Sequence, residues 1–307
     1  MNHTTLEIFQ VVAEELSVVK AARRLGRVQS NVTTRIQQLE EELGVYLFIR
    51  ENKKLRLSPQ GNKFLVYSKQ ILSLAEEARQ SLHPGEPGGT LTLGSMESAA
   101  ASRLPAALAA FSRQCPGVRL RLMTGTTRQL TDKVLMSELD CALIAQPRSE
   151  DGKVVCPENL CSHPLYAEDL RLVLPPAMAT VKKIDDIAEG LLATFAKGCT
   201  YREIAVGLLS QRPGSGDNIQ LQEVYSYHAM LACVASGTAM CVLPQSVLAQ
   251  LPLPEGLTTL PAGTAITQLI WRQNFSSPAL DKLLSALQDT ADMTSWSRRK
   301  APDRPGA

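Results

Sequence analysis

A run of helix-breaking residues divides this chain into two parts with different patterns, and that division constrains the fold more than any other feature. The run is His83-Pro-Gly-Glu-Pro-Gly-Gly89, whose prolines and glycines interrupt helices and strands alike. Before it, apolar residues recur at helical spacing; after it, strand-like apolar runs alternate with helical patterns. We therefore expect a helical N-terminal part, a hinge over residues 83–89 and an α/β domain beyond it.

The N-terminal part opens with two short helices. Apolar residues at helical spacing run from Leu6 to Leu16, and Ser17 is a suitable N-cap for a second helix. That helix turns Ala21 and Ala22 inward, and Gly26 supplies the backbone freedom for a tight turn. The pattern is the outline of a helix-turn-helix.

The third helix combines an apolar stripe with an unusual polar face. Val32, Ile36 and Leu39 share one side of a helix predicted over residues 29–43. The other sides carry amide, hydroxyl and guanidinium groups, and residues 17–39 include no acidic side chain. Such groups hydrogen-bond base edges in a major groove, whereas a solvated helix more often mixes Glu with Lys. We interpret this face as a DNA-reading surface; the alternative is an ordinary solvated face.

A basic hairpin is predicted after Gly44, which ends the third helix. Residues 46–49 and 55–57 are the expected strands, and four basic residues lie between Arg50 and Arg56. Such a wing contacts phosphates, which adds affinity and salt sensitivity but little sequence preference. In isolation a solubilising turn would explain it equally well. The predicted DNA contacts are Arg24, Gln29, Ser30, Asn31, Thr33, Thr34, Arg35, Gln38, Arg50, Lys53, Lys54 and Arg56.

The first sixty residues match the pattern of a known family at many positions with fixed spacing. They resemble the DNA-binding signature of LysR-type transcription regulators, which implies a winged helix-turn-helix domain over residues 1–58. Departures at residues 18–20, Asn31 and Thr33 affect the operator sequence to be expected, not the module. The matching runs are Phe9-Gln-Val-Val-Ala13, Ala21-Ala-Arg-Arg-Leu25, Gln29-Ser30-Asn31-Val32, Leu39-Glu40, Leu43-Gly44, Leu47-Phe48 and Leu57-Ser58-Pro59, with Ser17, Ile36, Arg50 and Gly61.

A long linker helix is predicted over residues 59–82. Ser58 is a good cap, and Pro59 is compatible with the first turn. Apolar residues then follow alternating spacings of three and four, with Ser68 as the polar exception, which predicts a dimer interface. The alternative packs this stripe against the winged domain. The predicted dimerisation residues are Phe64, Ile71, Ala75, Ala78 and Leu82.

The remainder is predicted to be a two-lobed α/β domain over residues 90–294. Strand-like runs alternate with helices, which predicts parallel sheets. The LysR resemblance implies a domain similar to periplasmic solute-binding proteins, with lobe I at 90–163 and 265–294, lobe II at 164–264 and an effector between them. The expected strands are 91–94, 118–122, 141–145, 170–174, 191–195, 219–224, 240–243 and 266–271.

Effector contacts are expected in loops that follow strands, because ligands of such sheets bind beyond the carboxyl ends of the strands. Arg202 is suited to a carboxylate and Glu97 to an amine, which together would suit an amino-acid-like effector; pairing with other protein groups is the alternative. Tyr227 is expected nearby. The candidates are Ser95, Met96, Glu97, Ser98, Thr126, Thr127, Thr200, Tyr201, Arg202 and Tyr225.

Other classes of protein find little support in the sequence. No nucleophile motif, phosphate loop or metal cluster is evident, so neither catalysis nor a cofactor is expected. Cys156, Cys161 and His163 are too few for a zinc site. A solute-binding module or an enzyme with an added basic domain is the alternative, but a pure solute-binding protein would carry a leader sequence and lack the basic helix-turn-helix.

The resulting expectation is a cytoplasmic, effector-controlled DNA-binding regulator, acting as a homodimer or homotetramer. Its expected partners are double-stranded DNA, a small carboxylate or amino-acid-like molecule and RNA polymerase, with no membrane contact. No apolar run reaches the roughly 20 residues that a spanning helix needs. Residues 295–307 lack apolar periodicity and are predicted to be a disordered tail.

Overall fold

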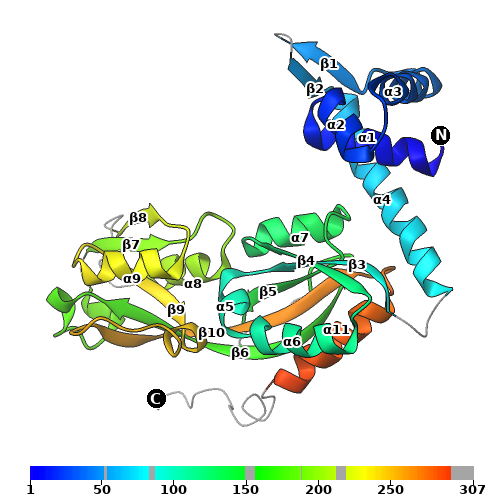
Figure 1. Cartoon of the computed structure of the whole chain (residues 1–307). Coiled ribbons are helices and arrows are strands. Elements are labelled where there is room, and N and C mark those ends of the chain that lie inside the picture. The colour runs from blue at the N-terminus through cyan, green and yellow to red at the C-terminus, as the bar shows by residue number, and fades with distance from the viewer. Residues whose placement is uncertain (52–53, 83–86, 149–155, 188, 212–218, 292–307) are drawn as a thin grey trace. The chain divides into compact units, whose positions relative to one another are not determined.

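The computed structural model describes residues 1–51, 54–82, 87–148, 156–187, 189–211 and 219–291. The chain forms two compact units (Figure 1). The first is Met1–Pro84, with Met136–Glu138 grouped to it; the second is Gly85–Leu135 with Leu139–Ala307. The hinge prediction falls partly, and the tail prediction wholly, outside the described residues.

The first unit contains the predicted helix-turn-helix, wing and long helix. Ser17 accepts a hydrogen bond from the Lys20 amide at the start of the second helix, as predicted. Gly26 and Gly44 end the second and third helices with φ of 62° and 67°, a left-handed conformation that favours glycine. The elements are α1 (His3–Glu15), α2 (Val18–Leu25), α3 (Gln29–Leu43), β1 (Phe48–Glu51), β2 (Lys54–Leu57) and α4 (Pro59–Ser81).

The core of this unit joins all of its helices. The Phe9 ring lies 5.5 Å from that of Phe48 and 5.1 Å from that of Phe64, so α1, the wing and α4 meet at one aromatic cluster. Ser58 caps α4 by accepting from the Gly61 amide at 2.8 Å. A Cβ at Gly61 would meet the Leu47 carbonyl oxygen, so only glycine permits this close approach of α4 to the wing.

The second unit is built on one mixed sheet of eight strands in the order β4-β3-β5-β10-β6-β9-β7-β8. β3 pairs in parallel with β4 and β5 at one end, and β7 pairs in parallel with β8 and β9 at the other. The strands are β3 (Gly89–Ser95), β4 (Val118–Thr124), β5 (Cys141–Pro147), β6 (Leu160–Leu174), β7 (Gly190–Thr194), β8 (Ile219–Glu223), β9 (Met240–Pro244) and β10 (Thr258–Arg272).

Two long antiparallel strands connect the two ends of the sheet. β10 pairs with β6 along nearly its whole length and with β5 from Ala265 to Trp271, while β6 reaches β9 only from Leu170 to Val173. The expectation of purely parallel sheets is therefore wrong for β6 and β10. The predicted segments 170–174 and 266–271 cover only part of these strands, each of which is 15 residues long.

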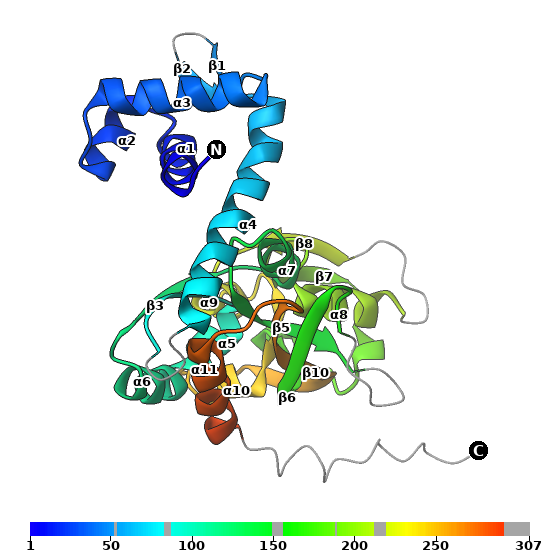
Figure 2. The ribbon, with the colours of Figure 1, turned by 90° about the vertical axis from the view of Figure 1, so that its right-hand side faces the viewer.

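Helices cover both ends of the sheet. Around β3, β4 and β5, α11 packs beside α6 (Figure 2). A separate apolar cluster joins α9 to the β7 and β9 end, with Tyr227, Met230, Val234 and Leu243 fully or nearly buried. The helices are α5 (Glu97–Ser102), α6 (Leu104–Gln114), α7 (Thr127–Leu135), α8 (Thr200–Ser210), α9 (Tyr227–Ala235), α10 (Gln245–Leu248) and α11 (Pro278–Thr290), with short 3-10 turns at Pro176–Met178 and Ile184–Asp186.

Candidate DNA interface and effector cavity

The outer face of α3 presents polar groups to solvent. Its apolar stripe is buried in the core of the first unit, with Val32 and Leu39 almost completely covered. Thr33 donates a hydrogen bond to the Gln29 carbonyl oxygen at 3.0 Å. Within the described residues the other predicted contacts on this helix form no hydrogen bond or ion pair with side chains; they are Ser30, Asn31, Thr34, Arg35 and Gln38.

The basic residues around α3 differ in whether they form ion pairs within the protein. Arg24 forms ion pairs with Glu14 at 2.8 Å and Glu15 at 3.1 Å, and the hydrogen bond to Glu15 is the main reason that the pKa of Arg24 is raised. In the wing, Arg56 pairs with Glu51 at 3.2 Å. Arg50 and Lys54 are exposed, and Lys53 lies outside the described residues.

The carboxylate of Glu40 ties α3 to the wing. Its Oε1 atom accepts from the Leu47 amide at 2.7 Å and from the Phe48 amide at 3.0 Å. Glu40, the first acidic residue after the acid-free residues 17–39, thus binds backbone amides of the protein itself.

The second unit contains a cavity of about 250 Å³ between its two lobes. It lies beyond the carboxyl ends of β3, β4, β7 and β8, where the following helices begin, as expected for sheets of this kind. Its lining residues are Met96, Glu97, Ser98, Thr124, Gly125, Thr126, Thr127, Gln129, Phe195, Ala196, Cys199, Thr200, Tyr201, Tyr225 and Tyr227.

Hydroxyl groups join the two sides of this cavity. Thr200 donates to the Ala145 carbonyl oxygen at 2.8 Å and to the Thr127 hydroxyl at 2.9 Å. The Ser98 hydroxyl donates to the Tyr201 oxygen at 3.4 Å. Because Thr127 and Ser98 come from lobe I and Thr200 and Tyr201 from lobe II, these bonds connect the lobes directly.

Burial disfavours ionisation of three side chains on the cavity wall, Tyr201, Tyr227 and Cys199. Burial raises the pKa of the Tyr201 and Tyr227 hydroxyls well above their ordinary values, and the Glu97 carboxylate adds a smaller rise at Tyr227. Burial also raises the pKa of the Cys199 thiol, against an opposing effect of the Arg202 and Tyr201 amides. These three groups therefore add no charge to the wall at neutral pH.

The cavity brings together eight of the ten effector contacts expected from sequence. Ser95 is not among its lining residues; it is fully buried, and its hydroxyl donates to the Met96 carbonyl oxygen at 2.9 Å. Arg202 is also outside the lining, because it donates to the Phe195 carbonyl oxygen at 3.1 Å and pairs with Glu223 at 2.6 Å. The two side chains expected to grip an amino acid are therefore not together in the cavity.

Several lining residues were missed by the sequence reasoning. Gln129 could have been predicted, because Thr126 and Gln129 have the spacing of a capping box at the start of α7. The Gln129 Oε1 atom accepts from the Thr126 backbone amide at 3.1 Å, and the Gln129 backbone amide donates to the Thr126 hydroxyl at 3.4 Å. Phe195 had no such signal, since it reads as an ordinary core residue, whereas Tyr227 lines the cavity as expected. Their rings meet edge to face at 5.0 Å.

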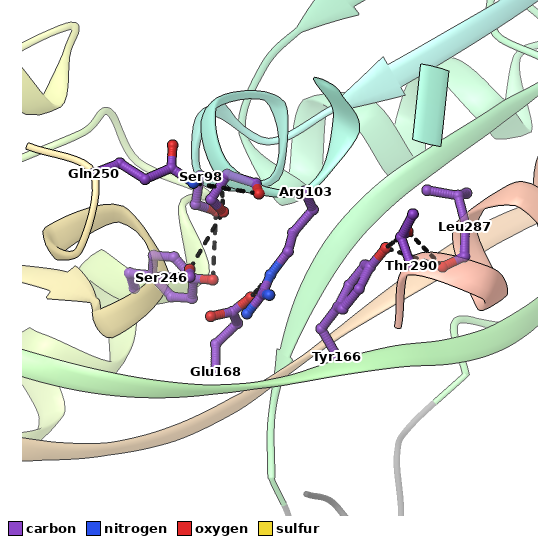
Figure 3. Close-up of polar contacts among 10 residues, drawn as sticks. Ser98, Arg103, Tyr166, Glu168, Ser246, Gln250, Leu287 and Thr290 are labelled. Atoms are coloured by element: carbon purple, nitrogen blue, oxygen red, sulfur yellow. Dashed lines mark hydrogen bonds and ion pairs between the residues drawn. The ribbon is translucent and has the colours of Figure 1, made fainter. Parts of the chain in front are cut away.

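A second set of polar contacts lies where β6 passes between the lobes. Figure 3 shows Arg103 reaching Glu168, and Tyr166 pointing toward Thr290. The Arg103 Nε atom lies 2.8 Å from Glu168, whose side chain is only 4% exposed, and the guanidinium stacks over the Tyr166 ring at 4.8 Å. Nearby, Ser102 of lobe I donates to Ser246 of lobe II at 3.3 Å. Specific polar pairs therefore join the two lobes of the second unit in this region.

The long helix α4 carries an exposed apolar stripe within the first unit. Tyr67 is 63% and Leu74 61% exposed, in line with Ile71, Ala78 and Leu82. Phe64 points inward to the aromatic cluster instead, Ala75 is half-buried and Ser68 is buried. The exposed stripe thus shares three residues with the predicted seam.

A helix-turn-helix with a polar outer face, joined to a two-lobed unit with a ligand-sized cavity, defines a DNA-binding regulator with a small-molecule binding domain. Residues 3–62 match the family model for the bacterial regulatory helix-turn-helix protein, lysR family, and residues 84–292 match the LysR substrate binding domain. The chain belongs to the LysR family of transcription regulators.

Relatives of known sequence extend over most of the chain. It is 34% identical to the HTH-type transcriptional regulator YusT of Bacillus subtilis, over 91% of this chain and 93% of that protein. It is 36% identical to the HTH-type transcriptional regulator GltR of the same organism, over 81% of each chain. These matches agree with the predicted class of protein.

Solved structures share the fold. Full-length OxyR C199D from Pseudomonas aeruginosa superposes with a TM-score of 0.70 at 23% identity, covering 95% of this chain and 96% of that one. CbnR in complex with its target DNA gives a TM-score of 0.64 at 22% identity, covering 95% of this chain and all of that one. The predicted fold class is confirmed.

Two further observations concern only the described part of the chain. No helix in it is long and apolar enough to cross a bilayer. Within the same residues, no three His, Cys, Asp or Glu side chains gather as a metal site would require, and Cys156 instead donates to the Leu160 carbonyl oxygen at 3.1 Å.

Proposed function

We propose that α3 reads operator bases while the wing holds the phosphate backbone. The observation that carries this assignment is the exposed, acid-free face of α3, where the side chains of Ser30, Asn31, Thr34, Arg35 and Gln38 have no partner among the described residues. Arg35, Asn31 and Gln38 have the donor and acceptor groups that pair with guanine and adenine edges. Arg50, Lys53 and Lys54 add phosphate contacts. Arg24, held by two carboxylates, orients α2 on α1 and reaches phosphate only if those pairs open.

The test is a selection of genomic DNA fragments by the purified full chain against bulk competitor duplex. We expect a few fragments to be enriched, each with an inverted repeat, because a symmetric dimer reads two half-sites. The variant Asn31→Ala/Arg35→Ala/Gln38→Ala should lose the enrichment, and Gln37→Ala, an exposed neighbour on α3, should keep it. A wild-type chain without preference for any fragment would contradict the assignment.

We infer that the chain acts as a homodimer or homotetramer joined through α4. A stripe formed by Tyr67, Ile71, Leu74, Ala78 and Leu82 has the spacing of a coiled-coil seam and would otherwise leave large apolar side chains in water. Ile71→Asp should shift the chain to monomers in sedimentation experiments. Gln60→Asp, in the first turn of α4 and outside the stripe, should leave the assembly unchanged.

The cavity between the lobes is proposed as the effector site. Its size is just below the roughly 300–1,000 Å³ typical of drug-sized ligands, which favours a small molecule. Separation of the lobes would break the hydrogen bonds across the cavity, and a ligand that prefers one arrangement shifts the population by its difference in affinity. We further propose that the response reaches RNA polymerase and that the protein has no catalytic activity and works in the cytoplasm.

A further inference from the structure

The charge of the cavity wall identifies the chemistry of the molecule that it accepts. Among the described residues that line the cavity, Glu97 is the one acidic residue and none is Lys, Arg or His. Within the described residues Glu97 forms no ion pair or hydrogen bond. An anionic ligand would bring a second negative charge beside this carboxylate in a partly desolvated space, which is unfavourable.

Two of the four helix starts around the cavity, those of α7 and α9, offer an anion little compensation. The starts of α5 and α8 have no side-chain cap, and α5 carries the Glu97 carboxylate in its first turn. At α7, the Arg128 amide donates to the Gly198 carbonyl oxygen at 3.2 Å, and the Thr126 and Gln129 groups satisfy each other. At α9, the Ala229 amide donates to Ser226 at 3.1 Å. Amides already bonded to protein acceptors are poor sites for a carboxylate.

Aromatic rings make up much of the remaining wall. Phe195, Tyr201 and Tyr227 are wholly or partly buried, while Tyr225 lines the cavity although it is 83% exposed. Faces of such rings attract cations, and their edges and the Met96 side chain pack against apolar groups. The wall thus offers one carboxylate, several rings and neutral hydroxyls.

We propose that the cavity binds a small organic amine in its cationic form, with the ammonium group beside Glu97 and an apolar or aromatic body between the rings. This inference rests on the proposed function of the cavity as the effector site. It replaces the amino-acid-like expectation, because Arg202 is engaged by Glu223 and the Phe195 carbonyl oxygen and supplies no carboxylate contact.

The test uses three probes with the same phenylethyl body and different charge: phenethylamine, 2-phenylethanol and 3-phenylpropanoate. Binding to the full chain is measured by calorimetry and thermal shift. Phenethylamine should bind about tenfold more tightly than 2-phenylethanol, because only the amine gains the carboxylate and ring interactions. The carboxylate should bind less tightly than the alcohol.

Variants locate the effect. Glu97→Gln should weaken phenethylamine about tenfold and leave 2-phenylethanol within about twofold. Tyr225→Leu should weaken the amine about threefold more than the alcohol. Glu203→Gln is the matched control, because Glu203 is an exposed acid in the first turn of α8 outside the cavity lining.

Tighter binding of 3-phenylpropanoate than of phenethylamine, or an amine affinity unaffected by Glu97→Gln, would overturn the amine assignment and leave the cavity's role as an effector site intact. Failure of all three probes to bind would also overturn it. Failure of the proposed function would show differently: cavity ligands of any charge would bind without changing the affinity of the chain for its selected DNA fragment.

Discussion

The face of α3 and the wall of the cavity are both rich in hydroxyl groups and other uncharged polar groups, but these groups form hydrogen bonds within the protein mainly in the cavity. On α3 the groups of Asn31, Arg35 and Gln38 face solvent without protein partners among the described residues. In the cavity the hydroxyls of Thr127 and Thr200 are bonded to each other. Residues on the exposed face of α3 can therefore change one by one without affecting the fold. The polar groups of the second unit, in contrast, also hold its two lobes together.

The strongest test of this contrast removes one buried ion-pair partner. Arg103→Leu leaves the Glu168 carboxylate buried and uncompensated, so we expect the free energy of unfolding to fall by about 3 kcal/mol in urea titrations. Arg35→Leu, on α3, should change it by less than about 0.5 kcal/mol. Arg103→Leu/Glu168→Leu should recover part of the loss. Equal effects of the two single variants would remove the contrast.

Substitutions on the exposed face of α3 should instead change the sequence specificity of DNA binding. Arg35→Ala is expected to reduce the preference for operator over random DNA roughly 10- to 100-fold, because a bidentate base contact is lost. Lys54→Ala should weaken binding to both DNAs alike and lower the salt slope by about 1, since it removes one phosphate contact. Binding titrations at several salt concentrations separate these two results. Parallel losses in both variants would contradict the division of roles.

A hydroxyl in the cavity should matter for stability where a hydroxyl on α3 does not. Thr200→Val removes the bonds to Ala145 and Thr127 and is expected to cost about 1–2 kcal/mol in unfolding free energy. Thr34→Val, exposed and unbonded on α3, is the matched control and should cost less than about 0.5 kcal/mol. The same urea titrations measure both, and a Thr200→Val variant as stable as wild type would show that the lobes do not depend on this bond.

The smallest predicted effect is a loss of stability in alkaline solution. Burial raises the pKa of Tyr227 in the folded chain, so this hydroxyl stays protonated while its unfolded counterpart ionises near pH 10. The folded state then loses about 0.8 kcal/mol from this group between pH 8 and pH 10.5. Tyr227→Phe should reduce the alkaline decline by that amount. An unchanged pH dependence would mean that Tyr227 ionises normally in the fold.

The parts of the fold that depend on local rules could be predicted from the sequence. The bounds of α3 follow from its stripe and from Gly44, and the start of α4 follows from Ser58 and Pro59. The full lengths of β6 and β10 could not be predicted in this way. Outside the predicted segments these strands carry polar residues such as Glu168 and Asp169 in β6 and Thr264 in β10, which break the apolar runs that mark a buried strand.

The candidate sites show the same limit. Loops after strands located most of the cavity, because strand ends converge in any sheet of this type. The pairing of side chains could not be predicted. Nothing in the sequence around Arg202 indicates that its guanidinium pairs with Glu223, 21 residues later. Likewise Phe64 and Tyr67 both fit a helical stripe, and only the packing of Phe9 separates the inward ring from the outward one.

The bonds from Glu40 to the Leu47 and Phe48 amides have a consequence for how such a regulator can diversify. They anchor α3, the helix proposed to read bases, to the hairpin proposed to contact phosphates, at a residue that is not among the proposed base contacts. New residues on the outward side of α3 can therefore acquire a different target site while the spacing between the two DNA-contacting elements is preserved. A single inward-facing carboxylate allows target choice to evolve separately from the geometry of docking.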